Sequence, residues 1–136
     1  VDNAPTGGLR WMAEVFAGSG LLTKAFRQTG WRVLPIDLET NEVVHQSTDL
    51  TNSDQQDQLC AALRSLRVEF VHLGTPCASF SRARRLDGGP PPIRTSQHIL
   101  GRPNLRPADR RKVEQGNALA EFVQLSEHVL RYHLSL

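Results

Sequence analysis

Apolar residues in this chain alternate between compact runs and helically spaced sets. A compact run at 11–16 ends in the turn Ala17-Gly18-Ser19-Gly20. Residues 21–29 then place apolar side chains on one helix face, and Gly30 follows as a stop signal. The pattern predicts a strand, a tight turn and a helix.

Further strands are predicted along the chain. Residues 31–38 and 43–50 are strand candidates, and residues 70–74 give the clearest pattern of a buried strand. Pro35 counts against the first of them, because a proline in a central strand removes a ladder hydrogen bond.

Two more helices are predicted. Residues 53–66 begin with Ser53 as a cap and carry early acids and regularly spaced leucines. Residues 113–132 form a longer periodic stretch, and residues 133–136 are compatible with the start of another strand. The inward residues of the long helix are expected to be Leu119, Phe122, Val123, Val129 and Leu130.

Strand–helix–strand alternation predicts an α/β fold, a parallel sheet with helices on both faces. Right-handed crossovers then favour the strand order 3-2-1-4, numbered along the chain. Ligands of such sheets bind outside the carboxyl ends of the strands, at the switch point between strands 1 and 4. This topology predicts one crevice that contains the glycine turn at 17–20 and the turn at 74–77.

Length and composition fit one globular domain over residues 1–136. The chain is 39% apolar and 22% charged, has no apolar run long enough to span a membrane, and lacks signal-peptide features in residues 1–8. Cys60 and Cys77 form no CxxC motif, which excludes a structural zinc site. Reduced thiols and an intracellular setting, the cytoplasm or the nucleus, are therefore expected.

The charge is unevenly distributed. Nine basic and two acidic residues fall within 81–112, although the whole chain has a net charge of +2. This segment is rich in proline and glycine and has no periodicity, which predicts a lid, a binding loop or a disordered segment. Its arginines suit phosphate and favour a nucleic-acid partner. The alternative is a solvated loop that uses charge for solubility.

The glycine turn has the features of a ligand site. Gly18 and Gly20 can adopt backbone angles closed to other residues, and the helix after them offers N–H groups. Asp37 is placed to accept hydrogen bonds from ribose hydroxyls, and Asp49 is placed to reach an adenine amino group. Thr23 stands where a dinucleotide motif has its third glycine, which disfavours NAD. The alternative is a glycine turn without a ligand.

Cys77 is the reactive candidate. It follows Pro76, which stiffens the turn, and several arginines come shortly after it. Nearby positive charge favours the thiolate, which is the nucleophilic form. The alternative is an inert thiol packed under the sheet. We adopt that interpretation for Cys60, which lies on a predicted helix between apolar residues.

The sequence around these candidates resembles a known family. Pro76-Cys77-Ala78-Ser79-Phe80-Ser81 resembles the Pro-Cys-x-x-Phe-Ser signature of DNA cytosine-5 methyltransferases. Phe16-Ala17-Gly18-Ser19-Gly20 resembles that family's S-adenosylmethionine loop, and Asp37 and Asp49-Leu50 fall where it keeps ribose and adenine contacts. Residues 116–122 look like the start of the helix after its catalytic loop.

The resemblance implies a Rossmann-like methyltransferase fold, S-adenosyl-L-methionine as cofactor and DNA as partner. It implies that Cys77 attacks C6 of a cytosine flipped out of the duplex, after which C5 takes the methyl group. Nucleic-acid contacts are implied for Ser81, Arg82, Arg84 and Arg85. Cofactor contacts are implied for Phe16, Ala17, Gly18, Ser19, Gly20, Leu21, Asp37, Leu38, Asp49, Leu50 and Pro76.

The chain departs from the family pattern in several respects, and Ala78, for example, replaces a common glutamine. The family's next strand carries a Glu-Asn-Val motif whose glutamate supports the attack on cytosine, and this motif is not found up to Leu136. We therefore expect the chain to need a further protein segment and to have little or no activity alone. Two alternatives stay open: a non-catalytic nucleotide- or nucleic-acid-binding module that keeps the fold, and a half-sheet that pairs with itself.

Overall fold

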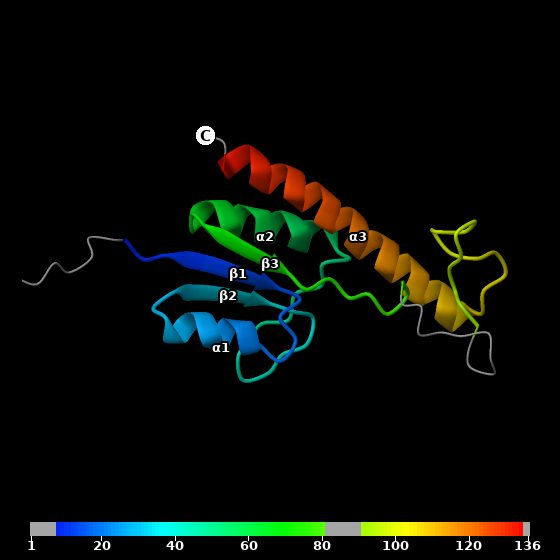
Figure 1. The fold of residues 1–136 in the computed structure, drawn as a ribbon, viewed down its shortest axis with the longest axis horizontal. Coiled ribbons are helices and arrows are strands. Elements are labelled where there is room, and N and C mark those ends of the chain that lie inside the picture. Colours follow the sequence, from blue (N-terminus) through cyan, green and yellow to red (C-terminus); the bar gives the residue numbers. More distant parts are fainter. Residues whose placement is uncertain (1–7, 81–90, 135–136) are drawn as a thin grey trace, which may run out of the picture. The chain divides into compact units, whose positions relative to one another are not determined.

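The computed structural model describes residues 8–80 and 91–134, with side chains up to residue 127. It confirms an α/β structure (Figure 1). The chain divides into two compact units, residues 1–74 and residues 75–136. The elements are β1 (Trp11–Val15), α1 (Leu21–Gln28), β2 (Arg32–Ile36), α2 (Ser53–Ser65), β3 (Phe70–Leu73) and α3 (Pro107–Leu134).

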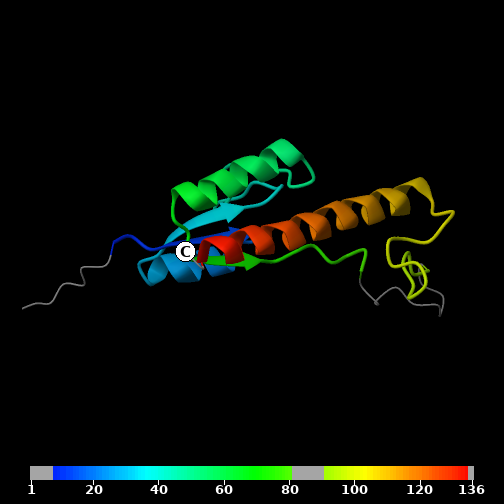
Figure 2. The same ribbon diagram turned by 90° about the horizontal axis from the view of Figure 1, so that it is seen from above.

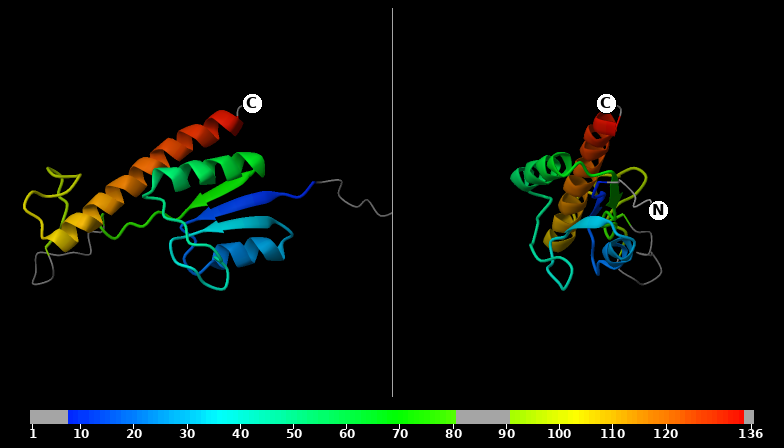
Figure 3. Two further views of the ribbon diagram at one scale, coloured as in Figure 1. Left: turned by 180° about the vertical axis from the view of Figure 1, so that it is seen from behind. Right: turned by 90° about the vertical axis from the view of Figure 1, so that its left-hand side faces the viewer.

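The first unit is built on a three-stranded parallel sheet of order β2-β1-β3. Trp11 of β1 is in register with Arg32 of β2, and Met12 of β1 is in register with Phe70 of β3. The crossover from β1 to β2 runs in the opposite direction to the crossover from β2 back to β3. Right-handed crossovers therefore place α1 and α2 on opposite faces of the sheet, as Figures 2 and 3 show.

The strand expected at 43–50 does not form, so the full order 3-2-1-4 is not observed. In the described chain this segment makes a single parallel bridge, to the end of β2. The amides of Val43 and Val44 donate instead to the side chain of Asn41, at 2.8 and 2.9 Å, and both valines are buried. Because Asn41 binds these two amides, they are not available for the hydrogen-bond ladder of a strand.

Only the central strand of the sheet is well covered. Every residue of β1 after Trp11 is buried, whereas β3 exposes 44% of Phe70. The expectation that residues 70–74 form a buried strand is wrong, because β3 lies at an edge of the described sheet and none of its residues is buried. β2 forms the other edge, where Pro35 is tolerated because an edge strand has fewer ladder bonds to lose.

The helix α2 is capped one residue earlier than the sequence pattern predicted. Asn52, rather than Ser53, is the N-cap, and its side chain accepts the amide of Gln55 at 3.1 Å. Leu59 and Leu63 lie one turn apart on the buried face of this helix, which confirms the predicted periodicity.

In the second unit, α3 begins well before the expected start at residue 113. Pro107 suits the first helical position and Asp109 the first turn, where it accepts two bonds from Arg106. The apolar pattern missed this turn because residues 107–112 carry no apolar face. The helix continues to Leu134, so no strand starts at residue 133. Leu119 and Phe122 are buried, Val123 is half-buried, and the side chains of Val129 and Leu130 lie outside the described residues.

Part of the expected basic loop is ordered. Ile93 is buried and its carbonyl accepts the amide of Arg102 at 2.9 Å. Gly101 has a φ of 118° and packs against α3, where a Cβ would lie 2.6 Å from Cγ1 of Val113. Of the predicted loop, residues 91–106 form these turns, residues 107–112 are helical, and residues 81–90 lie outside the described chain.

Candidate cofactor and nucleophile sites

The carboxyl end of β1 runs into a turn with a left-handed backbone. Phe16, Gly18 and Gly20 have φ values of 62, 54 and 69°. The amide of Gly20 donates to the carbonyl of Ala17 at 2.9 Å, and the amide of Ala17 donates to the carbonyl of Ile36 at 3.0 Å. The turn is thereby closed on itself and tied to the end of β2. Glycine suits positions 18 and 20, because a left-handed residue with a Cβ costs about 1–2 kcal/mol, a cost that Phe16 bears.

Asp37 follows β2 and binds the glycine turn. Its Oδ2 accepts the amide of Gly18 at 2.8 Å, and its Oδ1 accepts the amide of Glu39 at 3.1 Å. A carboxylate has roughly four acceptor positions, so two bonds leave capacity for ligand hydroxyls. The structure therefore brings together two elements that the sequence predicted separately, the glycine turn and the acid after the second strand.

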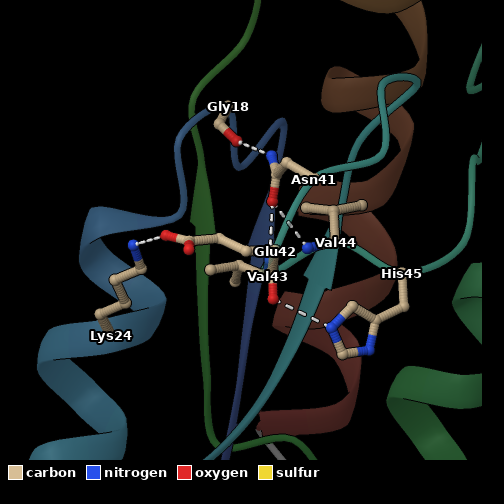
Figure 4. Close-up of polar contacts among 7 residues, drawn as sticks. All are labelled: Gly18, Lys24, Asn41, Glu42, Val43, Val44 and His45. Atoms are coloured by element: carbon tan, nitrogen blue, oxygen red, sulfur yellow. Dashed lines mark hydrogen bonds and ion pairs between the residues drawn. The ribbon is translucent and has the colours of Figure 1, made fainter.

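A segment after β2, residues 38–48, is termed the strap (Figure 4). Asn41 fastens it to the glycine turn, because its Nδ2 donates to the carbonyl of Gly18 at 2.7 Å. The Oδ1 of the same side chain accepts the amides of Val43 and Val44. One asparagine thus orders the strap and bonds the turn, which the hydrophobic pattern did not indicate. The available signal was local, since asparagine side chains commonly bond amides two or three residues on.

Two further contacts hold the strap. A Cβ added to Gly20 would lie 2.7 Å from Cγ1 of Val43, so the two residues are packed too closely for any other residue at position 20. Glu42 pairs with Lys24 of α1, and this hydrogen bond and charge hold the pKa of Glu42 below its ordinary value. Nε2 of His45 lies 3.0 Å from the carbonyl of Glu42 (Figure 4).

The other predicted cofactor residues differ in what they can offer. Leu21 and Leu38 are 71% and 50% exposed, and Ser19 is exposed as well. Leu50 is 3% exposed, so its side chain belongs to the core and only its backbone can meet a ligand. Asp49 is half-buried and accepts the hydroxyl and the amide of the residue two positions on, which lowers its pKa.

Glu14 is a polar residue of this region that the motif search passed over. It is the next-to-last residue of β1, is buried, and accepts hydrogen bonds from the amide of Thr23 at 2.8 Å and from the Thr23 hydroxyl. It therefore caps α1, whose N-cap residue is Gly20 and makes no side-chain cap bond. The signal in the sequence was an acid that interrupts an otherwise apolar run.

Cys77 lies in the second unit, at the start of a tight turn. The amide of Phe80 donates to the carbonyl of Cys77 at 2.9 Å, and Ser79 is buried inside the turn. Gly116 of α3 faces Ser79, and a Cβ at that glycine would overlap the serine Oγ. The thiol of Cys77 is exposed, unlike that of Cys60, whose pKa is raised by burial. An accessible thiol is what a nucleophile requires.

The predicted nucleic-acid contacts Ser81, Arg82, Arg84 and Arg85 lie outside the described residues. Pro76 is exposed. Among residues 8–80 and 91–134, no group of three or more His, Cys, Asp or Glu side chains is arranged to hold a metal ion. In the same part of the chain, no helix combines the length and hydropathy of a membrane span.

The glycine turn of the first unit has an open side with polar and apolar groups beside it. Within the described chain no atom lies within 4 Å of a Cβ placed on Gly18, so the outer side of the turn is open. Asp37 offers carboxylate lone pairs beside this opening, and the neighbouring Leu38 offers exposed apolar surface. Comparison with known proteins adds no assignment, because no family model, curated protein or solved structure matches this chain.

Proposed function

We propose that this chain is a Rossmann-like domain of a DNA cytosine-5 methyltransferase, which binds S-adenosyl-L-methionine at the glycine turn and uses Cys77 as its nucleophile. The observation that carries the proposal is the bond between the amide of Gly18 and Oδ2 of Asp37. It joins a left-handed glycine turn to an acid at the end of the neighbouring parallel strand. Nucleoside ligands of α/β sheets use this pair of features.

Different residues of the first unit are proposed to contact different parts of the cofactor. Asp37 accepts ribose hydroxyls with its remaining lone pairs, and Leu38 covers one face of the adenine. Asp49 accepts the adenine amino group, next to the backbone of Leu50. Within this turn the amides of Ala17, Gly18 and Gly20 are bound by protein acceptors. The amides of Ser19 and Leu21 are proposed to face the amino-acid end, as helix N-termini do for anions. The bound cofactor supplies an electrophilic methyl group.

Cys77 performs the proposed covalent step. Its thiolate adds to C6 of a cytosine, so the Sγ–C6 bond forms and the C5–C6 π electrons move to C5. C5 then takes the methyl group, and the electrons of the broken bond stay on the sulfonium sulfur. Loss of the C5 proton to water restores the C5–C6 double bond and releases the thiolate. The exposure of Cys77 supports this role.

DNA is the proposed partner. Ser81, Arg82, Arg84 and Arg85 follow Cys77 directly in the chain and are proposed to bind phosphates near the flipped base. Such binding weakens steeply as salt rises, because phosphate contacts release counterions. The glutamate of the family's Glu-Asn-Val motif would come from a further segment, so the proposed reaction of this chain alone is slow.

The strap favours a second candidate function. The N–H and the C=O of Gly18 are bound by Asp37 and Asn41, and Val43 covers Gly20. The turn therefore has protein partners of its own. A non-catalytic nucleotide- or nucleic-acid-binding module would keep this arrangement without needing a reactive thiol.

Cofactor binding is tested by calorimetric titration with S-adenosylhomocysteine, which carries no reactive methyl group. We expect weak binding that Asp37→Ala abolishes. Glu39→Ala is the matched control, because it removes a nearby exposed carboxylate that makes no bond to the turn through its side chain. Absence of heat at millimolar ligand, with no chemical-shift change at Gly18, would contradict the proposed site.

The covalent step is tested with an oligonucleotide that contains 5-fluorocytosine, in the presence of S-adenosyl-L-methionine. After methyl transfer the fluorine on C5 cannot leave as a proton does, so the Cys–C6 adduct stays trapped. We expect an adduct with the natural chain and with Cys60→Ser, and none with Cys77→Ser. Cofactor binding without any adduct would favour the non-catalytic module. If neither cofactor binding nor an adduct is observed, both the proposed cofactor site and the proposed nucleophile are contradicted.

A further inference from the structure

The guanidinium of Arg94 is saturated with hydrogen bonds. An arginine side chain has five N–H donors, and the five bonds of Arg94 account for all of them. Nε donates to the carbonyl of Ser79 at 3.2 Å, and Nη2 donates to the Ser79 hydroxyl at 3.0 Å and to the carbonyl of Val113 at 3.1 Å. Nη1 donates to the carbonyl of Ile99 at 2.6 Å and to Oδ1 of Asn117 at 2.8 Å.

The same group stacks on the turn that carries Cys77. The Arg94 guanidinium carbon lies 3.8 Å from the centre of the Phe80 ring, which is cation–π distance. Gly116 leaves room for this arrangement, since a Cβ there would lie 3.0 Å from Nη2 and overlap Ser79 Oγ. Glycine inside a helix costs about 1 kcal/mol, so a close approach of this kind is a physical reason for it.

Arg94 belongs by sequence to the basic segment that was expected to bind phosphate. Its geometry points to another task, because every N–H is already directed at a protein oxygen. The acceptors come from the Cys77 turn, from the loop at 91–106 and from α3, so one side chain joins the three parts of the second unit. Burial lowers the pKa of Arg94, yet an arginine remains charged at physiological pH.

We propose that Arg94 is the positioning residue of the Cys77 turn, which it holds through Ser79 and Phe80, and that it makes no phosphate contact. Whether this positioning affects a reaction rests on the proposed function of Cys77 as a nucleophile. Ser79 lies two residues and Phe80 three residues after the thiol, and the Phe80 amide closes the turn on the Cys77 carbonyl. Fixing both residues fixes the backbone that presents the thiol.

Lysine cannot replace this arginine. It keeps the charge but has three donors on one atom in place of a planar fork, and it cannot stack as a plane on Phe80. Arg94→Lys therefore removes the geometry and retains the charge. Arg110→Lys is the matched control, because Arg110 is an exposed arginine of α3 within the same basic segment.

The first test uses the full chain and needs neither cofactor nor DNA. We expect Arg94→Lys to speed hydrogen exchange of the Phe80 amide by roughly tenfold or more, the effect of losing a charge-assisted bond. Arg110→Lys should leave that rate unchanged. In Arg94→Ala, added methylguanidinium should restore protection of the Phe80 amide, whereas a variant that merely unfolds gains no protection from a guanidinium salt. Ser79→Ala, which removes one acceptor, is the milder variant and should show a smaller increase.

The second test connects the turn to the reaction. We expect Arg94→Lys to slow adduct formation with the 5-fluorocytosine oligonucleotide about tenfold, while iodoacetamide labelling of Cys77 changes little because the small reagent does not depend on the angle of attack. Unchanged Phe80 exchange in Arg94→Lys and Ser79→Ala would overturn the proposal. Equal adduct rates for Arg94→Lys and the natural chain would do the same. If the natural chain forms no adduct, the proposed function of Cys77 fails, and Phe80 exchange still decides the role of Arg94.

Discussion

The buried carboxylate of Glu14 caps the helix that follows the glycine turn, by accepting the amide of Thr23 at 2.8 Å. The acid lies in the central strand, so the bond joins β1 directly to α1. We expect Glu14→Gln to lower the free energy of unfolding by about 1–3 kcal/mol, because the charged acceptor is lost and an amide group faces the donors of Thr23. Urea unfolding measures this change. Glu39→Gln, an exposed carboxylate of the same unit, should have almost no effect, and equal losses for the two variants would contradict the capping role.

Gly20 and Gly18 differ in what surrounds them, although both have a positive φ. Gly18→Ala should cost about 1–2 kcal/mol of stability from backbone strain alone. Gly20→Ala should cost about 1–3 kcal/mol more, because its Cβ would lie 2.7 Å from Cγ1 of Val43. Thermal unfolding compares the two. The Val43→Gly background also removes the Val43 Cβ, which would lie 2.8 Å from the added Cβ. It should recover part of the Gly20→Ala loss, and no recovery would mean that the overlap does not decide the cost.

Asn41→Asp separates the two tasks of the strap asparagine. It keeps an oxygen for the amides of Val43 and Val44, but it loses the donor to the carbonyl of Gly18. We expect both valine amides to keep their protection in hydrogen exchange, with a stability loss of about 1 kcal/mol from the missing bond. Asn41→Ala should lose the valine protection as well. Full valine protection in Asn41→Ala would show that the strap does not depend on this side chain.

The pKa of Asp49 predicts a response to acid. The hydroxyl and then the amide of Thr51 hold this pKa below its ordinary value of 3.8. Asp49 therefore adds stability above that pH and loses it as the pH falls through the lowered pKa. Thr51→Val should raise the pKa toward 3.8, followed by the carboxyl carbon shift in an NMR titration. Thr40→Val is the control, and an unmoved pKa in Thr51→Val would contradict the assigned cause.

The two thiols should differ in reactivity. Cys77 is exposed, whereas burial raises the pKa of Cys60 and leaves less thiolate at neutral pH. We expect iodoacetamide to label Cys77 first, and we expect the difference to shrink as the pH rises or as urea unfolds the chain. Mass spectrometry resolves the two sites. Equal rates in the folded protein at neutral pH would contradict the exposure of Cys77.

The sequence by itself determined the alternation of strands and helices. Local spacing was sufficient for β1, α1, β2, α2 and β3, because apolar periodicity and glycine or cap signals act within a few residues. It also singled out the glycine turn and Asp37, because these residue types follow strand ends. Their contact followed from the parallel topology, which brings the carboxyl ends of neighbouring strands to one edge.

Only the tertiary structure decided which polar groups meet across the chain. The sequence pattern predicts a strand at 43–50. In the structure, however, the side chain of Asn41 accepts the hydrogen bonds of two amides that a strand ladder would have used. From the sequence, Arg94 is predicted to be one of several phosphate-binding arginines in a basic loop. In the structure its guanidinium donates hydrogen bonds to oxygen atoms of three separate segments. Hydrogen bonds between residues far apart in the sequence depend on where the fold places their partners. The local spacing of apolar residues gives no information about that placement.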